Sequence, residues 1–547
     1  MSQVELIMVG AARLCIALSR SDPSLMHRKK LPIGIQTFRE IRDDGCYYVD
    51  KTGFALQLIE SGKYYFLSRP RRFGKSLFLD TIAELFAGNE PLFRGLYAES
   101  RWDWTQRFPV IRLSFAEGVL HGREALDRRI EDLLRVNAES LGVAIPAGLD
   151  IVGQFGELIR RVQAAAGRRV VVLVDEYDKP ILDNLTAPDI ARELREGLRN
   201  LYSVIKGADA HIRFAMLTGV SKFSKVSLFS GLNNLNDITL DHAFSAICGY
   251  TETDLDSVFA AELEGLDRDA IRHWYNGYNW TGEAVYNPFD VLLLFQKRQF
   301  RPWWFETGTP TFLIDLLTQR QTWLPRLGQL ETDAELLSAF DVGRITTEAL
   351  MFQTGYLTIG EEEQLSGAWF YRLRYPNHEV YQSLNAALLD AWTPDVQVNV
   401  RHRRSLHRLL LANDFAGMAQ LFTAVFASIP TDWYRNNPIA RYEGYYASVF
   451  YAYFAALGLD VTVEESSNAG RLDMAVRFND QVFLFEFKVV ELSPEGRALQ
   501  QIKERGYANR HRSEGSAIHL IGVEFSREQR NLVAFDVETL AACDDQR

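Results

Sequence analysis

The stretch LSRPRRFGKSLFLDT, residues 67–81, decides the fold class because it carries most of a phosphate-binding loop. Such a loop has the pattern G-x-x-x-x-G-K-[ST], and Gly74, Lys75 and Ser76 stand where the pattern requires them. Arg69 occupies the position of the first glycine. An apolar run, YYFL, precedes the loop and helical apolar spacing follows it, so the strand–loop–helix context of the motif is present. The sequence therefore predicts a nucleotide-binding α/β domain.

The chemistry of phosphate binding explains which residues of the loop matter. Phosphate is bound by backbone N–H groups at a helix N-terminus, by a lysine that reaches the β- and γ-phosphate oxygens, and by a hydroxyl that coordinates Mg²⁺. Arg69, Arg71 and Arg72 either add positive charge around a triphosphate or face solvent. We expect ATP and Mg²⁺ as cofactors here, with these binding residues: Arg69, Arg72, Gly74, Lys75 and Ser76, the last also a Mg²⁺ ligand.

A second continuous apolar strand, RRVVVLVDEYDKPI at 168–181, ends in acidic residues. Its Asp175 is placed to hold Mg²⁺, and Glu176 to orient a hydrolytic water. Thr218, at the end of a third strand, RFAMLT, is either a sensor of the γ-phosphate or a structural residue. The alternative to nucleotide binding is that Lys75 is a surface lysine and the two acids cap a loop. Hydrolysis is a separate prediction, because a catalytically silent switch keeps the same residues.

Strands that alternate with helical segments in this part of the chain indicate a parallel sheet covered on both faces. Between residues 331 and 385 the pattern changes to helix, GYLTI, WFYRLRYPN and a further helix, which is the element order of a winged helix. This stretch is either a small packing domain or a module that reads DNA through Arg372 and Arg374. The basic run RHRRSLHR that follows is interpreted as a solvated helix face.

A second constellation lies near the C-terminus: Asp473, twelve intervening residues, then Glu486, Phe487 and Lys488. Alternation along a strand puts Glu486 and Lys488 on one face, and a neighbouring hairpin strand can bring Asp473 to the same place. Two carboxylates hold a hard divalent cation, and an adjacent lysine activates water or stabilises charge on phosphorus. The alternative is a structural salt bridge between Glu486 and Lys488, because a charged pair in an apolar strand is costly unless paired.

Three further side chains are candidates for the same centre. Glu443, in the helix before the strands, is a candidate metal ligand alongside the two carboxylates. Gln501 and Tyr507, on the helix that follows, are candidates to contact the metal or the phosphate. The pattern favours a metal-dependent nuclease-type site over the structural salt bridge.

These motifs resemble those of a bacterial family that pairs an AAA-ATPase-like N-terminal domain with a C-terminal PD-(D/E)XK nuclease-superfamily domain. The resemblance begins near Leu31 and rests on LPIGIQTF, YYVDKT, SRPRRFGKSLFLDT, VVLVDEYDKPI, WYNGYNW, VYNPFDV and GRLDMAV…FLFEFKV…LQQI. It implies ATP binding through Lys75, Ser76 and Asp175, with Glu176 as the water-orienting acid. The arginine at the first glycine position is normal for this family.

For the C-terminal part the resemblance implies a nuclease-type centre at Asp473, Glu486 and Lys488, with Gln501 as the polar residue of the following helix. Leu472 stands where the superfamily's name has proline. The implied fold is α/β multidomain. Its expected domains are an extension at 1–30, an AAA-like P-loop ATPase domain at 31–240, a helical lid at 241–330, a winged-helix-like and helical middle domain at 331–430, and a restriction-endonuclease-like α/β domain at 431–547.

Composition limits the setting in which the protein works. The formal net charge of −11 argues against a surface coated for nucleic acid, although local basic grooves remain compatible with it. Four scattered cysteines without a CxxC pair fit neither a disulfide framework nor a zinc site, which predicts a cytoplasmic protein. The run VELIMVGAARLCIAL is too short to span a bilayer, so no membrane association is expected. Residues 1–25 are interpreted as a dispensable extension.

The function predicted from the sequence is an ATP-binding, ATP-hydrolysing protein that controls a Mg²⁺-dependent DNA endonuclease, acting on foreign or mobile DNA. The alternative is an ATP-dependent switch or scaffold whose nuclease-like domain only binds. DNA is the expected partner. A homo-oligomer is expected if an arginine is supplied in trans, and Arg213 and Arg272 are among the candidates for that arginine.

Overall fold

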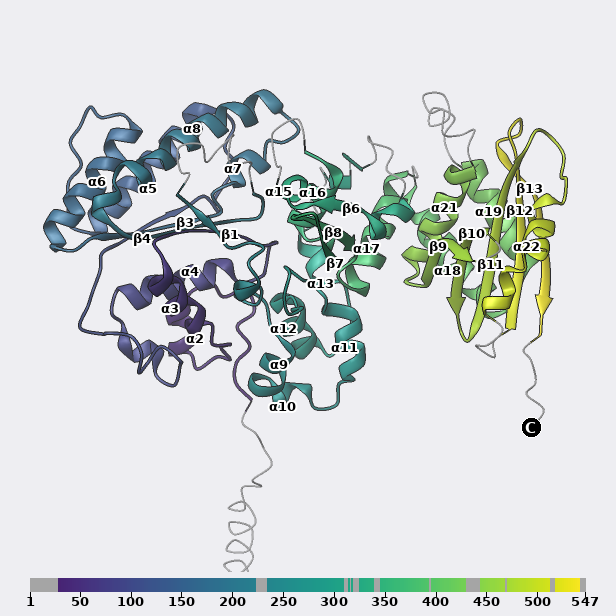
Figure 1. Ribbon diagram of the computed structural model, residues 1–547, viewed down its shortest axis with the longest axis horizontal. Coiled ribbons are helices and arrows are strands. Elements are labelled where there is room, and N and C mark those ends of the chain that lie inside the picture. The colour runs from purple at the N-terminus through teal and green to yellow at the C-terminus, as the bar shows by residue number, and fades with distance from the viewer. Residues whose placement is uncertain are drawn as a thin grey trace, which may run out of the picture.

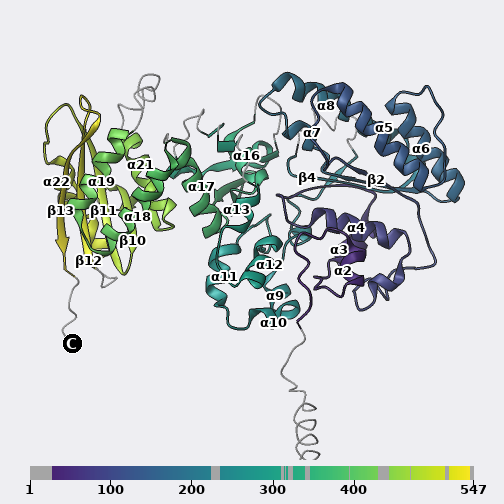
Figure 2. The ribbon, with the colours of Figure 1, turned by 180° about the vertical axis from the view of Figure 1, so that it is seen from behind.

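A computed structural model of the chain describes most of it in three parts that follow one another in sequence (Figure 1). An α/β part lies at one end, a mainly helical part with a small sheet lies in the middle, and a second α/β part lies at the other end; the view from behind shows the same order (Figure 2). The expected extension at 1–30 lies almost wholly outside the described residues. The described residues are 28–222, 234–308, 313–314, 316–317, 324–338, 345–392, 395–428, 443–467, 470–511 and 517–541.

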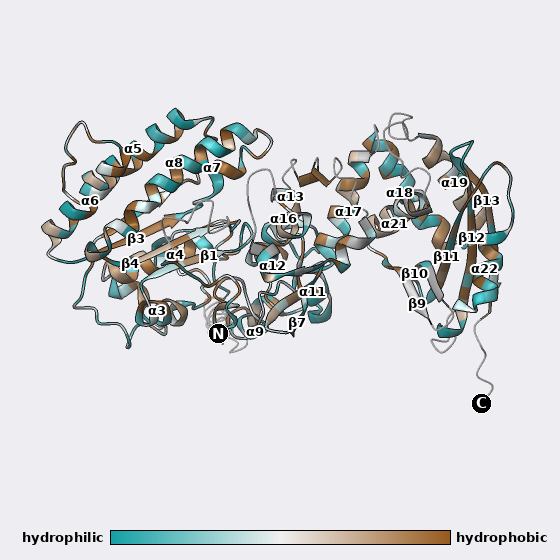
Figure 3. Ribbon diagram, turned by 45° about the horizontal axis from the view of Figure 1, so that its top comes forward, coloured by the Kyte–Doolittle hydropathy of each residue, from teal (hydrophilic) through white to brown (hydrophobic). Residues whose placement is uncertain are grey.

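The first part is built on a five-stranded parallel sheet with the order β2-β3-β4-β1-β5. Its strands are β1 Tyr64–Ser68, β2 Val110–Ser114, β3 Val170–Asp175, β4 Ile212–Gly219 and β5 Asn236–Asp237. The sheet is apolar, whereas the helices outside it alternate polar and apolar faces (Figure 3). This confirms the predicted parallel sheet, although β2 and β5 were not foreseen, because one is a five-residue strand containing an arginine and the other has two residues.

Helices cover both faces of this sheet, as a parallel sheet requires. On one side lie α5, α6, α7 and α8; on the other lie α2, α3 and α4 (Figure 1). Their bounds are α2 Phe38–Asp43, α3 Thr52–Ser61, α4 Lys75–Phe86, α5 Arg123–Ser140, α6 Ile151–Ala166, α7 Lys179–Leu182 and α8 Pro188–Gly207.

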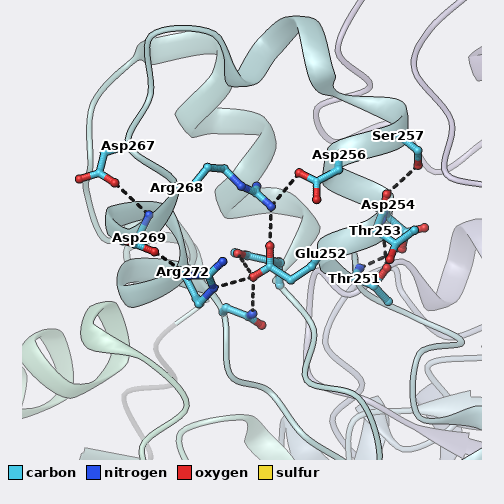
Figure 4. A network of polar contacts seen from close by, with 12 residues as sticks. Thr251, Glu252, Thr253, Asp254, Asp256, Ser257, Asp267, Arg268, Asp269 and Arg272 are labelled. Atoms are coloured by element: carbon cyan, nitrogen blue, oxygen red, sulfur yellow. Dashed lines mark hydrogen bonds and ion pairs between the residues drawn. The ribbon is translucent and has the colours of Figure 1, made fainter.

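Five short helices follow and form a small unit with its own apolar core. They are α9 Glu252–Val258, α10 Ala260–Leu263, α11 Arg268–Tyr275, α12 Pro288–Lys297 and α13 Trp303–Gly308. Figure 4 shows how Glu252 joins α9 to α11: its carboxylate pairs with Arg268 and with Arg272 Nε at 2.9 Å. Arg272 also pairs with Asp269 at 2.7 Å. This candidate arginine is therefore already held within its own unit.

The middle of the chain contains a three-stranded antiparallel sheet with the order β6-β8-β7. Its elements are β6 Glu331–Asp333, α15 Ala334–Ser338, α16 Thr347–Thr354, β7 Thr358–Leu365, β8 Ala368–Arg374 and α17 His378–Trp392. The predicted helix–strand–strand–helix order is confirmed. Helix α16 ends at Gly355, whose φ of +90° is a left-handed conformation that glycine adopts without strain.

The last part is a five-stranded mixed sheet with the order β13-β12-β11-β10-β9, in which only β11 and β12 are parallel. Its strands are β9 Asp460–Ser467, β10 Gly470–Phe478, β11 Gln481–Val490, β12 Ala517–Ser526 and β13 Asn531–Leu540. Its helices are α18 Val396–Leu411, α19 Phe415–Ser428, α21 Glu443–Ala456 and α22 Arg497–Arg505. Strand β13 was not predicted from the sequence; it is an edge strand that is only half-buried.

The two faces of this sheet carry different helices. The ring of Phe450 on α21 lies 5.1 Å from that of Phe487, so α21 covers the face of the odd-numbered residues of β11. Ile502 on α22 packs with Leu484, so α22 covers the face of the even-numbered residues. Glu486 and Lys488 are therefore on the α22 face.

Candidate functional site

The phosphate-loop motif connects the end of β1, inside the sheet, to the N-terminus of α4. Gly74 caps α4 with φ of +92°, a conformation that disfavours other residues. Arg72 also has a positive φ, +69°, and its guanidinium lies over the Phe289 ring with 4.9 Å to the centroid. The local geometry therefore presents a helix N-terminus at the end of a central strand, which is where P-loop proteins bind phosphate.

Lys75 points back into the loop instead of into solvent. Its Nζ donates to the main-chain oxygens of Arg69 at 2.9 Å and Pro70 at 3.0 Å. Burial lowers the pKa of this ammonium group, and the charges of Asp175 and Glu176 act in the opposite direction. The interpretation of Lys75 as a surface lysine is therefore wrong, because only 6% of the residue is exposed.

Arg69 requires a correction. Its side chain is 0% exposed, so it does not face solvent. Its terminal nitrogens donate to the main-chain oxygens of Thr239 at 2.9 Å and Phe244 at 3.2 Å, and its guanidinium stacks on Trp280, 4.2 Å from the ring centroid. Those bonds occupy both terminal nitrogens, so the expectation that Arg69 contributes charge to a triphosphate is not supported. The arginine fastens the loop to residues 239–245.

The acids at the end of β3 lie beside the loop lysine, close enough for their charges to affect its pKa. Asp175 accepts a hydrogen bond of 2.7 Å from Thr218 Oγ1, which places the strand-end threonine against the carboxylate. Glu176 has φ of +49°, and burial raises the pKa of its carboxyl. The structure thus brings Lys75, Asp175, Glu176 and Thr218 together from three neighbouring strands. Thr218 orients Asp175 whether or not it also senses phosphate.

Asp178 was missed by the sequence analysis. This carboxylate is buried, and burial raises its pKa. It accepts hydrogen bonds from Ser221 N at 2.6 Å and Ser221 Oγ at 2.5 Å, and so fixes the chain just after β4. A Cβ at Gly219 would lie 2.4 Å from Asp178 Oδ1, so the close approach requires glycine. The signal was present in the second aspartate of DEYD.

An apolar cavity of about 70 Å³ adjoins the N-terminus of α4. Gly74, Leu77 and Phe78 line it on one side, and the segment around Pro32 and Tyr47 lines it on another. The cavity therefore lies next to the loop glycine and opens between the N-terminal segment and the helical unit. Its position is suited to a flat apolar group attached to a phosphate chain.

The second site is formed by β10, β11 and α22. The register pairs Met474 with Phe485, which places Asp473 opposite Glu486 on the α22 face. Asp473 Oδ2 accepts a hydrogen bond of 2.8 Å from Phe487 N. Glu486 is 0% exposed and receives hydrogen bonds at Oε1 from Lys488 Nζ, at 3.1 Å, and from the amide of Gln501. The structure brings together all four residues: Asp473, Glu486, Lys488 and Gln501.

The electrostatics at this site favour a cation. Burial and, after it, the negative charge of Asp473 raise the pKa of the Glu486 carboxyl to about 7, against the opposing effect of Lys488. Its Oε2 is buried without a hydrogen-bond partner among the described residues. Glu486 and Lys488 form the ion pair that the alternative of a structural salt bridge predicts. It leaves one buried carboxylate oxygen unpaired beside a second acid, and this fits a divalent cation held by oxygen ligands.

Two other candidates have different outcomes. Glu443 begins α21, but its side chain lies outside the described residues. Tyr507 is buried on the α22 face, and its pKa is raised by burial and by the charge of Glu486, which places it next to the site. Within the described part of the chain, no group of three His, Cys, Asp or Glu side chains is arranged to hold a metal. Among the described residues, the site therefore offers two carboxylates, those of Asp473 and Glu486.

Glu524 was missed by the sequence analysis, and it positions α22. This buried carboxylate on β12 accepts hydrogen bonds from the backbone N–H groups of Glu495 and Arg497, both at 2.6 Å, at the start of the helix. Burial raises the pKa of Glu524, but these backbone bonds outweigh burial and lower it. At Gly522 a Cβ would lie 2.2 Å from Leu499 N. The strand thus holds the helix that carries Gln501 at close range.

Changing Glu524 to alanine is expected to lower the activity of the site about 10- to 100-fold, the range for residues that orient ligands of a metal centre. Without the carboxylate the first turn of α22 loses its cap and Gln501 loses its fixed position. Glu524→Gln keeps one acceptor oxygen and should restore part of the loss. Hydrogen exchange at residues 495–501 should rise in step with the loss, and Glu528→Ala is the control. Unchanged exchange and activity would contradict the positioning role.

Comparison with known proteins gives two family matches. Residues 32–229 match the family model described as Predicted AAA-ATPase, and residues 441–535 match the PD-(D/E)XK nuclease superfamily. The chain is also 67% identical over 516 residues to a protein of Azotobacter chroococcum mcd 1 named "Uncharacterized protein in vnfD 5'region". That alignment covers 94% of this chain and all of the relative. Among the described helices, none has the length and apolarity needed to cross a membrane.

Proposed function

Because the chain belongs to the family of predicted AAA-ATPases that carry a PD-(D/E)XK nuclease-superfamily domain, we propose that it binds and hydrolyses ATP and that the nucleotide controls a Mg²⁺-dependent DNA endonuclease. The observation that carries the nuclease proposal is the state of Glu486. It is fully buried, a second carboxylate lies opposite, and one of its oxygens has no hydrogen-bond partner in the described part of the chain. Foreign or mobile DNA is the proposed substrate, and the cytoplasm the proposed location.

At the nuclease site Asp473 and Glu486 would hold Mg²⁺, which supplies charge neutralisation at the scissile phosphate and acidifies a water. Lys488 has its ammonium group at Glu486 Oε1. From there it can donate to a phosphate oxygen and stabilise the negative charge that develops on phosphorus. Gln501 donates to the same carboxylate and fixes its orientation.

At the nucleotide site the backbone N–H groups at the start of α4 would bind the phosphates. Lys75 would exchange the carbonyl oxygens of its own loop for phosphate oxygens. Ser76 and Asp175 are the proposed Mg²⁺ ligands. Glu176 is proposed to orient water, since burial raises its pKa and makes the carboxylate a stronger base. The cavity beside Gly74 is proposed to take the adenine ring.

Control of one site by the other is supported by a contact with the loop itself. The indole Nε1 of Trp304, on α13, donates a hydrogen bond of 3.1 Å to the main-chain oxygen of Arg71. Pro70 packs against Gly355, where a Cβ would lie 2.7 Å from the proline ring. The conformation of the phosphate loop is therefore tied to α13 and to the end of α16.

The same tryptophan is tied to α17. Its backbone N–H lies 2.7 Å from Asp290 Oδ1 and 2.9 Å from Glu379 Oε1, at the start of that helix. Both carboxyls are buried, and burial raises the pKa of each, that of Asp290 to about 7. Burial therefore disfavours the ionised form of both acids, and the charge of Asp290 disfavours that of Glu379 further. Trp304 therefore connects the phosphate loop, α13 and α17.

From α17 the connection continues into the nuclease-type part. Tyr381 on α17 donates a hydrogen bond of 3.1 Å to the main-chain oxygen of Leu459, just after α21. Helix α21 packs through Phe450 on Phe487, which stands between Glu486 and Lys488 in β11. A movement of the loop on ATP binding can therefore be passed to β11 through packed elements.

Changing Trp304 to phenylalanine is expected to uncouple the two sites. The substitution keeps an aromatic ring against Tyr356 and removes only the donor to Arg71. ATP affinity and cleavage without nucleotide should stay within about threefold of wild type, while the effect of ATP on cleavage should fall about fivefold or more. The control is Trp303→Phe, because the neighbouring indole donates to the main-chain oxygen of Gln299, which is not part of the phosphate loop. An unchanged ATP effect would exclude this route.

The proposed function is tested by DNA cleavage. Supercoiled and linear DNA are incubated with the protein and Mg²⁺ or Mn²⁺, with and without ATP, and ATP hydrolysis is followed in parallel. We expect metal-dependent cutting whose rate depends on ATP. ATP hydrolysis without cutting under any condition would overturn the nuclease proposal and leave the nucleotide proposal standing.

The second candidate function is an ATP-dependent switch or scaffold with a silent nuclease-like domain. It is favoured by the Lys488–Glu486 ion pair, which already gives the carboxylate a partner without metal. The third interpretation, DNA reading through the small middle sheet, has no such support. Arg372 pairs with Glu331 at 3.2 Å and with Glu361 at 3.1 Å, so its charge is engaged by acids of its own sheet.

A further inference from the structure

Exposed large apolar side chains gather in two places outside the sites described above. Twelve large apolar residues are exposed in the described part of the chain. The β7–β8 hairpin contributes three of them and α18 another three. Scattered exposed apolar residues need no explanation, but a group on one face of one element marks a contact surface.

The first surface is the outer side of the three-stranded sheet, which we call the acidic sheet face. Leu365 and Phe370 are its apolar members, 49% and 41% exposed. The register pairs Glu363 with Phe370 and Glu361 with Arg372, so both glutamates share the side of Phe370. Glu331 of β6 is also opposite Arg372 and adds a third acid. Arg372 and Arg374 of β8 are exposed on the same side, so the face has an apolar centre and three acids against two arginines.

The second surface runs along α18, and we call it the basic helix face. At 3.6 residues per turn the exposed residues Val396, Val400, Arg404, Arg408 and Leu411 fall within one side of the helix. The three apolar members are about half exposed. They form a stripe flanked by arginines. Its pattern is the complement of the acidic sheet face: apolar against apolar and positive against negative.

The position of α18 argues against DNA as the occupant of its basic face. The ring of His407, on α18, lies 5.6 Å from that of Phe478, which shares the side of Phe483 and Phe487 in the mixed sheet. This is the α21 side. Glu486, Lys488 and Gln501 are on the α22 side, so the arginines of α18 do not lead a phosphate backbone into the nuclease-type centre.

We propose that the acidic sheet face of one copy of this chain docks on the basic helix face of a second copy. The two faces are both exposed within one chain, and each has the charge and apolar pattern that the other lacks. Because the surfaces differ, the contact is head-to-tail, and repetition of it gives a ring or a chain of subunits. Neither face includes a residue of the nucleotide or nuclease-type site, so the assembly is independent of both.

The proposal is tested by sedimentation of the full chain over a range of concentrations. Wild type should associate, and raising the salt from about 0.05 to about 0.5 M should weaken the association because the charges are exposed. Glu361→Lys with Glu363→Lys, and separately Arg404→Glu with Arg408→Glu, should each weaken it about tenfold or more. The control is Glu362→Lys, which reverses a charge on the opposite side of the same strand.

The decisive sample is a mixture of the two reversed variants. Lysines on the sheet face of one chain then meet glutamates on the helix face of the other, and association should return. A wild-type chain that stays monomeric at every concentration would overturn the proposal, as would reversed variants that associate like wild type. If the arginine variant lost binding to a short duplex DNA while wild type stayed monomeric, the basic helix face would be a nucleic-acid surface instead.

Discussion

Replacing Glu486 by alanine is expected to reduce metal-dependent DNA cleavage by more than about 1,000-fold, the size of loss that follows removal of an essential catalytic group. The carboxylate is the point where three groups meet: Asp473 lies opposite, and Lys488 and Gln501 both donate to it. Without it a divalent cation would lose one of two acidic ligands, and Lys488 would lose its partner. Glu491→Ala, an exposed acid at the end of the same strand, is the control.

A second measurement separates loss of the metal site from loss of the fold. Metal that binds the folded chain raises its melting temperature, so Mn²⁺ should stabilise wild type. Glu486→Gln keeps the shape of the side chain and should melt like wild type without metal, but it should no longer respond to Mn²⁺. Cleavage that persists in both Glu486 variants would place the active site elsewhere. A Mn²⁺ response without any cleavage would point to the binding-only alternative.

Replacing Lys75 by alanine is expected to weaken ATP binding about 10- to 100-fold, the worth of hydrogen bonds to a charged group, and to remove ATP hydrolysis. The ammonium group belongs to the first residue of α4, and within the described part of the chain it donates to the main-chain oxygens of Arg69 and Pro70. Binding is measured with a fluorescent ATP analogue. Lys29→Ala, at an exposed position, is the control.

The same variant tests the direction of control. If nucleotide governs the nuclease-type site, Lys75→Ala should cut DNA at a rate that no longer changes when ATP is added. Wild-type ATP affinity in the variant would show that the loop does not bind phosphate in the proposed way. Lost ATP binding with an unchanged effect of ATP on cleavage would show that ATP acts at another place.

The elements around the nucleotide loop could be predicted because their signals are local. A buried strand, a glycine with a positive φ and a helix start all lie within the short segment 64–81. The role of Arg69 could not be predicted in the same way. Its partners are carbonyl groups at Thr239, Phe244 and Ser245, and these reach it only through the fold. A buried arginine and a phosphate-binding arginine look alike in a sequence.

At the nuclease-type site, too, some features could be predicted from the sequence and others could not. Alternation placed Glu486 and Lys488 on one side of a strand, and the hairpin brought Asp473 opposite. Glu524 was not foreseen, because its function depends on a parallel pairing of β12 with β11 across an intervening helix. Glu524 and Gly522 lie on the same side of β12, and the sequence alone does not show that α22 packs against that side. A side chain that positions other residues is therefore harder to recognise in a sequence than one that belongs to a catalytic motif.

The pairing of β1 in its sheet determines when the nucleotide loop can fold during synthesis. The strand that leads into the phosphate loop has β4 on one side, where Tyr64 pairs with Ala215 and Ser68 with Gly219, and β5 on the other. A growing chain therefore cannot fix its nucleotide loop until β4 has left the ribosome. All residues of the nuclease-type centre follow much later, and domains fold in the order in which they emerge. Each new molecule can thus complete its nucleotide-binding part before its nuclease-type centre has been synthesised.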